Sequence, residues 1–514
     1  MSAAATSADP LSSSRTLVQS LREALGREHG ADVPLIETHL SWVLLAGPWA
    51  YKIKKPVRLS FVDFSTLTAR RHFCDEELRL NRRFAPQLYV AVLPITGDAA
   101  QPQIGGDGEA IEFALQMHRM RDEDLAGARL ALGALAVSDL ERFAVTLARW
   151  HRDAAVAPRE AEFGTSTRVG ADVELLLADW PHADDADAVA DLRRWFAAQA
   201  DDTAARAAER LAHGHVRECH GDLHVDNLAF VDGELTAFDC LEFDPGLRWV
   251  DTISEVAFLA MDLQARQRPD LAHAFVDAYL DASGDADGLP LLRRYQVYRA
   301  LVRARVSRLR DAHARSPARD SVAAGYVALA QRLARQWDPR LLVTHGLPGS
   351  GKTQVSGALL RASGAIRWRS DVERARLLGG GRYQRADSDA VYARLHELAA
   401  LSLHSGLPTI IDAACLQRAQ RDGWQALATR IGVPFTLLSC EAPLSVLRQR
   451  VHERARRDDD ASEADEGVLE LLRSRAQPLA DDELAHTLRV DTSQPWSAAV
   501  LAAHWMATPT RVLV

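Results

Sequence analysis

The sequence predicts a chain of mixed class, α+β and α/β, with two consecutive folded regions. In the first 337 residues, strand-like segments come early and long stretches with helical periodicity follow. After Asp338-Pro339, apolar strand-like runs alternate with helical segments, which is the pattern of a parallel sheet with crossover helices. A chain of 514 residues has room for about two to four domains of ordinary size.

Composition and charge narrow the class of protein. The chain is 47% hydrophobic and 25% charged, which is ordinary for a globular protein, and its formal net charge is -9. This mild acidity gives no reason to expect nucleic-acid binding, and no apolar run reaches the roughly 18 residues of a membrane span. The 5 scattered cysteines suggest no disulfide framework, so we expect a cytoplasmic protein. Residues 1–14, rich in Ala and Ser, are expected to be a disordered tail rather than a signal peptide.

The first region begins with the elements of a small antiparallel sheet. Helices are expected at 15–30 and at 66–84, where Pro86 ends the second. A Gly-Pro-Trp turn joins the first two of four strand-like runs, which cover 38–47, 50–57, 89–95 and 111–117. Helical periodicity then dominates 121–213 and 252–336. We therefore expect a sheet-containing part at 15–120, a mainly helical part at 121–337 and a separate domain at 338–514.

The second region opens with a strand that leads into a phosphate-binding loop. The apolar run 341–345 is followed by the pattern G-x-x-x-x-G-K-[ST], whose residues are Gly346, Leu347, Pro348, Gly349, Ser350, Gly351, Lys352 and Thr353. The glycines let several backbone N–H groups point at one phosphate, and the following helix adds its positive end. Lys352 suits the β- and γ-phosphates, and Thr353 offers a hydroxyl ligand to Mg²⁺. The loop predicts a nucleoside triphosphate site, for which we expect ATP although the sequence does not discriminate adenine from guanine.

Two acidic segments extend this prediction from binding to catalysis. Asp371 follows the second strand signal, 365–368, and Arg374 comes one helical turn later. A carboxylate there can accept a proton from an acceptor hydroxyl, and the arginine can hold an anion. The same spacing is also typical of a solvated helix start. Asp412 ends the strand 409–412, where a carboxylate can contact Mg²⁺ or its waters.

An arginine-rich helix lies further along the second region. Its basic residues are Arg448, Arg450, Arg454, Arg456 and Arg457, and the acidic run 458–466 follows them. Such a charge run is either a solvated surface or a lid whose arginines, Arg450 and Arg454 among them, close on the transferring phosphate. The residues themselves leave both interpretations open.

Together these motifs make residues 338–514 resemble the small P-loop kinases, the group that contains polynucleotide kinase, chloramphenicol phosphotransferase and gluconate kinase. The loop is the specific element of the resemblance, and the acids and arginines support it. The resemblance implies ATP, Mg²⁺ and phosphoryl transfer, with Asp371 as the candidate base. It does not supply the acceptor.

A second constellation lies in the first region, at Cys219-His220-Gly221-Asp222-Leu223-His224-Val225-Asp226-Asn227. Asp222 and Asn227 have the D-x-x-x-x-N spacing of a kinase catalytic loop, in which the acid deprotonates the acceptor hydroxyl and the amide binds a metal. A hairpin expected at 228–238 leads to Asp239, a second metal-binding carboxylate. The cysteine and histidines of this run are also metal-ligand types, but no second ligand pair has zinc-like spacing.

This region resembles the aminoglycoside phosphotransferase and choline kinase family, which implies a two-lobed protein-kinase-like fold. The resemblance also implies a strand lysine for the α- and β-phosphates. Lys52 is favoured for this role over Lys54 and Lys55, and its helix partner is expected to be Glu77 or Glu76. One departure is that the G-x-G-x-x-G phosphate cover of protein kinases is missing before the lysine.

The order of the two regions resembles a bacterial family of fused phosphotransferase/ATP-binding proteins. The first hypothesis is a kinase with two nucleotide sites that phosphorylates a hydroxyl of a small metabolite, sugar or aminoglycoside-like acceptor. In the second, one half is catalytic and the other is an ATP-binding regulatory module. The third is a polynucleotide-kinase-like activity of the second half, which the acidic charge and the lack of a basic-aromatic groove disfavour. The acceptor, the coupling of the halves and the oligomeric state are not readable from the sequence.

Overall fold

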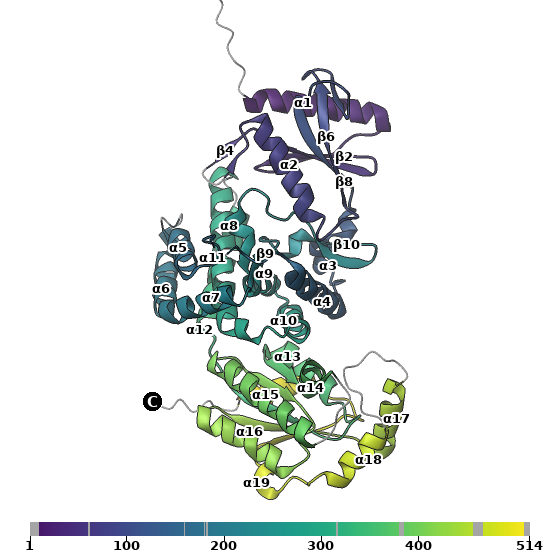
Figure 1. Ribbon diagram of the computed structural model, residues 1–514, viewed down its shortest axis with the longest axis vertical. Coiled ribbons are helices and arrows are strands. Elements are labelled where there is room, and N and C mark those ends of the chain that lie inside the picture. The colour runs from purple at the N-terminus through teal and green to yellow at the C-terminus, as the bar shows by residue number, and fades with distance from the viewer. Residues whose placement is uncertain are drawn as a thin grey trace, which may run out of the picture. The chain divides into compact units, whose positions relative to one another are not determined.

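The computed structural model describes residues 10–59, 62–158, 160–178, 180, 183–314, 317–379, 385–455 and 466–507. By its contacts the chain divides into two compact units. Unit 1 comprises Met1–Asp139, Arg149–Thr165 and Leu211–Glu255, and unit 2 comprises Leu140–Ala148, Ser166–Arg210 and Val256–Val514. The fold class is the one expected, with an antiparallel sheet in unit 1 and a parallel sheet in unit 2 (Figure 1). Unit 2 joins helical residues of the first region to the whole of the second.

Unit 1 is built on a six-stranded antiparallel sheet. Its strands, in spatial order, are β1 (Leu35–Glu37), β2 (Ser41–Ala46), β3 (Trp49–Lys54), β8 (Glu112–His118), β6 (Tyr89–Gly97) and β7 (Pro102–Ile104). The hairpin expected between β2 and β3 is present, and Gly47 at its turn has a φ of 54°. Two minor strands, β4 (Arg58–Leu59) and β5 (Val62–Asp63), pair apart from this sheet.

Two helices cover opposite faces of this sheet. Helix α1 (Pro10–His29) buries Leu17, Leu21 and other apolar residues in a cluster that includes Ala114 of β8. Helix α2 (Leu67–Asn81) packs over the next residue along β8, Leu115, because successive strand residues point to opposite faces. Residues 10–14 were expected in the disordered tail, and this expectation is wrong, since they form the start of α1 and Leu11 packs against the same cluster.

The rest of unit 1 consists of short elements around the catalytic-loop motif. Strands β9 (Val216–Glu218) and β12 (Trp249–Asp251) pair antiparallel, and β10 (Leu228–Val231) and β11 (Glu234–Ala237) form the expected hairpin. The short helical elements are α3 (Ala126–Ala131), η1 (Asp122–Asp124), η3 (Val225–Asn227) and α8 (Pro245–Arg248). The motif therefore lies between β9 and β10, and Asp239 lies just beyond β11.

Helices dominate the remaining part of the first region, as the periodicity predicts. They are α4 (Val137–Asp153), α5 (Ser166–Leu177), α6 (Ala186–Ala197), α7 (Ala200–Ala212), α9 (Thr252–Ala265), α10 (Pro269–Ser283), α11 (Leu289–Ala314) and α12 (Pro317–Arg335), with short turns η2 (Ala183–Asp185) and η4 (Ala286–Gly288). A buried cluster from α5, α6, α9, α11 and α12 forms their core and includes Phe196, Phe258 and Tyr326.

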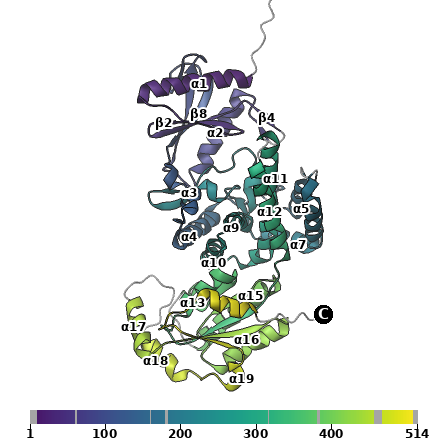
Figure 2. The same ribbon diagram turned by 180° about the vertical axis from the view of Figure 1, so that it is seen from behind.

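The parallel sheet of unit 2 has five strands. Their order is β14 (Ile366–Arg369), β15 (Thr409–Asp412), β13 (Leu341–His345), β16 (Phe435–Glu441) and β17 (Thr487–Asp491), and every neighbouring pair is parallel. Helices α15 (Arg385–His404) and α16 (Arg418–Ile431) lie over one face, and α13 (Lys352–Ser363) and α20 (Ala498–Ala507) cover the other (Figures 1 and 2). Smaller helices are α14 (Ser370–Leu378), α17 (Leu444–Ala455), α18 (Glu466–Arg475) and α19 (Asp481–Leu484). Strand order reverses beside β13, so the phosphate loop lies at the switch point where such sheets bind ligands.

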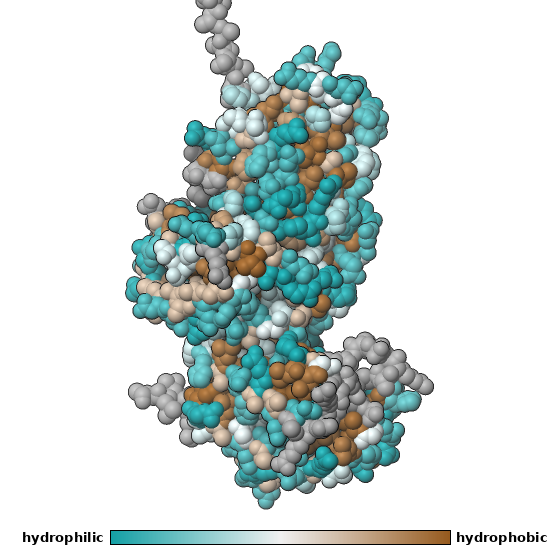
Figure 3. Space-filling view, viewed as in Figure 1, coloured by the Kyte–Doolittle hydropathy of each residue, from teal (hydrophilic) through white to brown (hydrophobic). Residues whose placement is uncertain are grey.

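The surface view of Figure 3 is mainly hydrophilic, with hydrophobic side chains in separate groups. Exposed large hydrophobic residues occur in both units, for example Leu132 in unit 1 and Trp337 in unit 2. Single exposed apolar residues of this kind are normal on protein surfaces. Within the described residues, no helix combines the length and apolar character needed to cross a membrane.

Candidate active sites

A strand lysine in unit 1 joins two carboxylates from distant parts of the chain. Lys52 of β3 donates to Glu77 Oε1 of α2 at 2.6 Å and to Asp239 Oδ1 at 2.6 Å. Burial opposes the charge of Lys52, but Asp239 and then Glu77 outweigh it and raise the pKa of the ammonium group well above its usual range. The lysine therefore stays charged, which is the state that a phosphate-binding lysine needs.

The other two lysines of this run, Lys54 at the end of β3 and Lys55 just after it, have different partners. Lys54, on the same strand face as Lys52, donates to the other oxygen of Glu77 at 2.7 Å and to Glu242 at 2.5 Å. Lys55 turns to the other face and donates to Glu37 at 2.8 Å. Of the three lysines, Lys52 is thus the one for which the structure records a bond to Asp239.

Glu77 is the acid that connects the two buried lysines. Its side chain has 0% exposure, and each of its oxygens accepts from one ammonium group. Burial would raise the pKa of this carboxyl, but Lys52 and then Lys54 lower it below its usual value. The alternative partner, Glu76, instead pairs with Arg79 at 2.9 Å. The lysine and glutamate favoured by the family resemblance are therefore brought together.

The catalytic-loop motif forms a turn between β9 and β10. Asn227 Nδ2 donates to the Asp222 carbonyl at 2.9 Å and to its carboxylate at 3.2 Å. Asp239 follows the hairpin with a φ of 62°, and its backbone N–H donates to the hydroxyl of Tyr89 at 3.0 Å. A left-handed conformation at a non-glycine residue costs energy and is typical of functional sites. Asp222 and Asp239 keep side-chain exposures of 35% and 47%, so both remain accessible to solvent.

Glu255, in the first turn of α9, supports the catalytic loop through hydrogen bonds to its backbone. Its Oε1 accepts from the backbone N–H groups of His220 and Gly221, each at 2.7 Å. Its Oε2 contacts His151 Nε2 at 2.8 Å. Burial opposes the charge, but the bond to His151 and these further contacts hold the pKa of the Glu255 carboxyl below its usual value. Glu255 is not predictable from the sequence, because nothing in its local spacing separates it from an ordinary helix acid.

Cys219 lies beside the same buried pair. Its sulfur and ligand atoms of His151 and Glu255 all lie within 4.8 Å of one another, the arrangement of a possible metal site. Both oxygens of Glu255, however, already accept protein donors, and burial raises the pKa of the Cys219 thiol well above its usual range. The bonds of Glu255 to His151 and to the two backbone N–H groups explain the cluster as support for the loop.

The phosphate loop of unit 2 connects β13 to α13. Gly346, Gly349 and Gly351 have positive φ values of 146°, 78° and 82°. A side chain at Gly346 would meet the Cys440 carbonyl at 2.5 Å, so glycine is required there for space as well as for conformation. Lys352 Nζ donates to the carbonyl oxygens of Gly346 and Leu347 at 2.9 and 3.0 Å. The remaining loop residues, Pro348, Ser350 and Thr353, complete the turn, and Thr353 lies in the first turn of α13.

Asp412 lies at the end of β15, where the sequence places it. Its side chain lies 3.1 Å from the hydroxyl of Ser356, and the carbonyl of Thr353 lies 3.2 Å from the same hydroxyl, whose single hydrogen these two acceptors share. The strand-end acid and the loop threonine are therefore linked through one buried serine. Carboxylate and hydroxyl oxygens are the ligands that Mg²⁺ prefers.

The other residues predicted for this site occupy α14 and α17. Asp371 lies in the first turn of α14, directly after β14, and Arg374 is buried one turn later. Arg450 of α17 donates to the Gly349 carbonyl at 3.2 Å and to Thr492 at 2.8 Å, so it contacts the phosphate loop itself. The side chain of Arg454, together with residues 456–465, lies outside the described part of the chain. The lid therefore stays a prediction.

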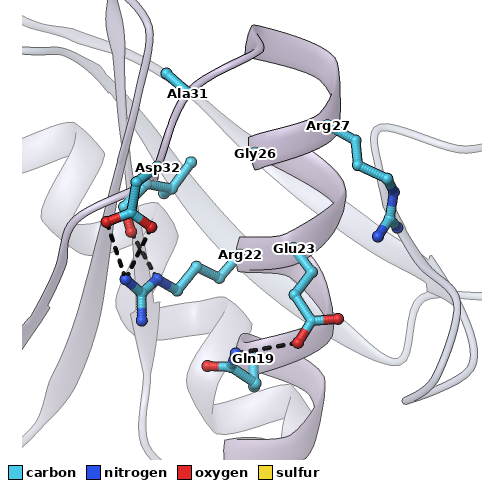
Figure 4. A pocket seen from close by; sticks show the side chains of 8 residues that line it. Gln19, Arg22, Glu23, Gly26, Arg27, Ala31 and Asp32 are labelled. Carbon is cyan, nitrogen blue, oxygen red and sulfur yellow. Dashed lines mark hydrogen bonds and ion pairs between the residues drawn. The ribbon is translucent and has the colours of Figure 1, made fainter.

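A surface pocket lies on α1 in unit 1. It is lined by Gln19, Arg22, Glu23, Gly26, Arg27, Ala31, Asp32 and Val33. The close view shows Arg22 directed at Asp32 and Gln19 at Glu23, so these polar groups bond to one another across the pocket (Figure 4). None of the lining residues belongs to the sites predicted from the sequence.

Comparisons with known proteins agree with the two constellations. The model of a family described as "Phosphotransferase enzyme family" matches residues 67–295, and a model described as "AAA domain" matches residues 341–479. Uncharacterized proteins of Mycobacterium tuberculosis and Mycobacterium bovis are 31% identical to the chain over 495 residues, which is 92% of this chain and 95% of theirs. The chain therefore belongs to the family of these mycobacterial proteins, in which an aminoglycoside phosphotransferase-like domain precedes a P-loop kinase domain.

Solved structures of kinases are also similar to parts of the chain. A choline/ethanolamine kinase family protein from Mesorhizobium loti is 13% identical, covers 62% of this chain and 95% of its own, and has a TM-score of 0.39. A sugar kinase from Janibacter is 23% identical, covers 33% of this chain and 95% of its own, and has a TM-score of 0.27. A gluconokinase from Sinorhizobium meliloti is 22% identical, covers 33% and 90%, and has a TM-score of 0.25. At these scores the family assignment rests on the sequence relatives and the family models.

The chain is thus a phosphotransferase of the kinase type, and both of its domain families imply ATP and typically Mg²⁺. The residues present fit these groups. The three glycines with positive φ let the loop backbone approach a phosphate. The side chains of Asn227, Asp239 and Asp412 offer oxygen atoms as ligands for Mg²⁺.

Proposed function

We propose that the chain is an ATP- and Mg²⁺-dependent kinase with two nucleotide sites, which phosphorylates a hydroxyl group of a small acceptor. The observation that carries the proposal is the Lys52 cluster, in which one ammonium group lies 2.6 Å from both Glu77 and Asp239. A lysine held by a helix glutamate beside a metal-type aspartate is the arrangement that kinases use for the α- and β-phosphates. The phosphate loop of unit 2 supplies the second site.

In the N-terminal site, Asp222 is the general base. It accepts the proton of the acceptor hydroxyl while the acceptor oxygen bonds to the γ-phosphorus, and the bond to the β,γ-bridging oxygen breaks to leave ADP. Asn227 and Asp239 hold Mg²⁺, which neutralises charge on the phosphates. The bond from Asn227 to the Asp222 carboxylate, 3.2 Å long, orients the base. The exposure of Asp222 leaves room for an acceptor to approach.

In the C-terminal site, Lys352 and the loop N–H groups bind the β- and γ-phosphates. Thr353 and Asp412 hold the metal ion, and Asp371 is the base, with Arg374 holding the acceptor. Arg450 keeps the loop in shape through Gly349, and Arg454 would close from the lid. Because unit 2 offers a base of its own, we propose a second catalytic site rather than a site that only binds nucleotide.

The two sites can be tested separately by Mg²⁺-dependent phosphorylation of a panel of sugars, amino sugars and nucleosides in the full chain. Asp222→Asn is expected to lower the N-terminal share of phosphorylation by about 10²- to 10⁴-fold, the usual contribution of a general base. Asp226→Asn is the matched control, since it makes the same change at an exposed position of the same loop. Lys352→Ala is expected to remove the C-terminal share.

Two outcomes would contradict the proposal. If Asp222→Asn leaves all phosphorylation unchanged, the N-terminal assignment is wrong. If Lys352→Ala leaves turnover unchanged but shifts stability or oligomeric state, the second half is a regulatory ATP-binding module. Tight, salt-sensitive binding of a single-stranded oligonucleotide would instead favour the polynucleotide-kinase-like activity.

A further inference from the structure

Helix α10 packs against the edge of the parallel sheet through three polar residues spaced four apart. His273 contacts the Arg361 carbonyl of α13 through Nδ1 at 2.9 Å. Asp277 pairs with Arg367 of β14 at 2.6 Å, and Asp281 lies 3.6 Å from Arg369 of the same strand. Residues four apart share one face of a helix, so this face of α10 is directed at the P-loop domain.

The contact between Asp277 and Arg367 connects α10 to residues of the candidate phosphate site. Besides its bond to Asp277, Arg367 donates through Nη1 to the Thr353 carbonyl and to the Ser356 hydroxyl, each at 3.3 Å. Ser356, with 0% exposure, donates in turn to Asp412 at 3.1 Å. The other two contacts of α10 reach a helix carbonyl and a strand arginine, and neither has a recorded bond to Ser356 or Asp412 among the described residues.

The bonds from Arg367 to Ser356 and from Ser356 to Asp412 connect α10 to the Asp412 carboxylate. Because the Ser356 oxygen accepts from Arg367, its single hydrogen is available to the Asp412 carboxylate and the neighbouring Thr353 carbonyl. Arg367 is itself buried, and the attraction of Asp277, then of Asp412, outweighs that burial and raises its pKa above the usual range. Without Asp277, Asp412 would exert the strongest remaining attraction on the same guanidinium, in competition with a metal ion.

We propose that Asp277 and Arg367 are positioning residues for the Mg²⁺ ligand Asp412, so that a helix of the phosphotransferase region completes the metal site of the P-loop domain. The proposal rests on the proposed function of the C-terminal site. On this proposal, the P-loop domain needs α10 for its metal site, because without α10 it lacks Asp277, the acid that holds Arg367 away from Asp412.

The test is the Mg²⁺ concentration that gives half-maximal ATP binding by the full chain, taken from the part of the signal that Lys352→Ala removes. Asp277→Asn is expected to raise this concentration by about tenfold or more, the usual effect of removing a group that orients a metal ligand. Ser356→Ala breaks the last contact without touching α10, and it is expected to shift the curve in the same direction. The two variants together keep the test valid if either one folds poorly.

His273→Ala is the matched control, since it removes a contact from the same helix face but not the one that leads to Asp412. It is expected to leave the Mg²⁺ dependence within about twofold of the parent chain. The proposal is overturned if Asp277→Asn and Ser356→Ala leave the Mg²⁺ curve unchanged, or if His273→Ala shifts it equally. If Lys352→Ala removes no ATP binding at all, the proposed function of this half fails first, and the two failures are thereby distinguished.

Discussion

The two candidate phosphate sites of this chain are assembled in opposite ways. In the N-terminal site, Lys52 bonds to Glu77 and Asp239, which are 25 and 187 positions away in the sequence. In the C-terminal site, Lys352 bonds to carbonyl groups only 6 and 5 positions away. One site is a product of tertiary packing and the other is a property of a short segment.

This difference predicts different costs when a residue is changed. The buried lysines and acids of unit 1 connect β3, α2 and the segment that contains Asp239 and Glu242. They are therefore expected to contribute to the stability of the fold as well as to phosphate binding. The phosphate loop depends on backbone conformation, and Lys352 donates to carbonyl groups of the loop that contains it. Changes in unit 1 are therefore expected to affect folding and activity together, whereas Lys352→Ala is expected to lower nucleotide binding and turnover at its own site more than stability.

The largest effect is expected from Glu77→Gln. The change removes the negative charge between Lys52 and Lys54 and leaves two buried ammonium groups with fewer partners. Breaking a buried pair in this way costs about 3–5 kcal/mol. Chemical denaturation of the full chain measures the loss, and Glu76→Gln on the same helix is the control, because its partly exposed pair with Arg79 is worth at most about 1 kcal/mol. Equal losses of stability in Glu77→Gln and Glu76→Gln would show that the buried acid contributes no more to folding than the partly exposed one. The N-terminal site would then not depend on buried ion pairs.

The brace behind the catalytic loop gives the next effect. Glu255→Ala leaves the N–H groups of His220 and Gly221 without their acceptor, and a buried unsatisfied group costs about 1–3 kcal/mol. The Asp222-dependent phosphorylation is expected to fall with stability, because the loop loses its support. Glu255→Gln keeps one acceptor oxygen and is expected to lie between the parent chain and Glu255→Ala. A fully active Glu255→Ala chain would show that the loop holds its shape without the brace.

A smaller effect is expected from Gly351→Ala in the phosphate loop. The φ of 82° at this position costs about 1–2 kcal/mol for a residue with a Cβ, and that atom would lie 3.2 Å from Thr492. ATP binding at the C-terminal site is expected to weaken while unit 1 keeps its activity. Gly325→Ala is the control, since this helical glycine of α12 has open space around it and gains helix propensity of up to about 1 kcal/mol. Unchanged ATP binding by Gly351→Ala would show that the loop does not depend on the left-handed backbone conformation at this position.

The same difference explains what the sequence could predict. The phosphate loop, its strand and the parallel strands after it are local patterns, and the structure has them where they were expected. The choice of Lys52 and Glu77 came from a family resemblance, because spacing alone cannot show which lysine of β3 faces a residue far along the chain. The family assignment and the fold class are confirmed, while the individual site roles remain proposals.

Residues missed from the sequence share a physical reason. Glu255 and Arg367 are charged residues in ordinary helix and strand patterns, where a charge normally indicates solvent. Their burial depends on elements that pack from elsewhere, namely the catalytic loop over Glu255 and α10 over Arg367. Lys54 was an alternative to Lys52 for the phosphate role, and its bond to Glu242 depends on the position of the loop after Asp239. Sequence periodicity carries no information on such long-range contacts.

The same comparison can be tested at Asp281 of α10, a largely buried acid of unit 2 that lies 3.6 Å from Arg369. Burial, and then the nearby Asp277, raise the pKa of Asp281 to about 7, although Arg369, Arg367 and Arg376 oppose the shift. A carboxyl whose pKa is raised on folding keeps its proton between about pH 4 and 7, where the unfolded chain releases it. Stability from this group is therefore present at low pH and lost as pH rises toward 7.

Asp281→Asn cannot titrate, and it is expected to flatten the decline in stability between about pH 4 and 7. At pH 8 the variant should be more stable than the parent chain by an amount on the order of 1 kcal/mol, because it no longer buries a second negative charge beside Asp277. Urea unfolding at several pH values measures the difference. A variant less stable than the parent at pH 8 would mean that the ionised pair with Arg369 outweighs the repulsion. The P-loop side would then depend on buried ion pairs much as the N-terminal site does.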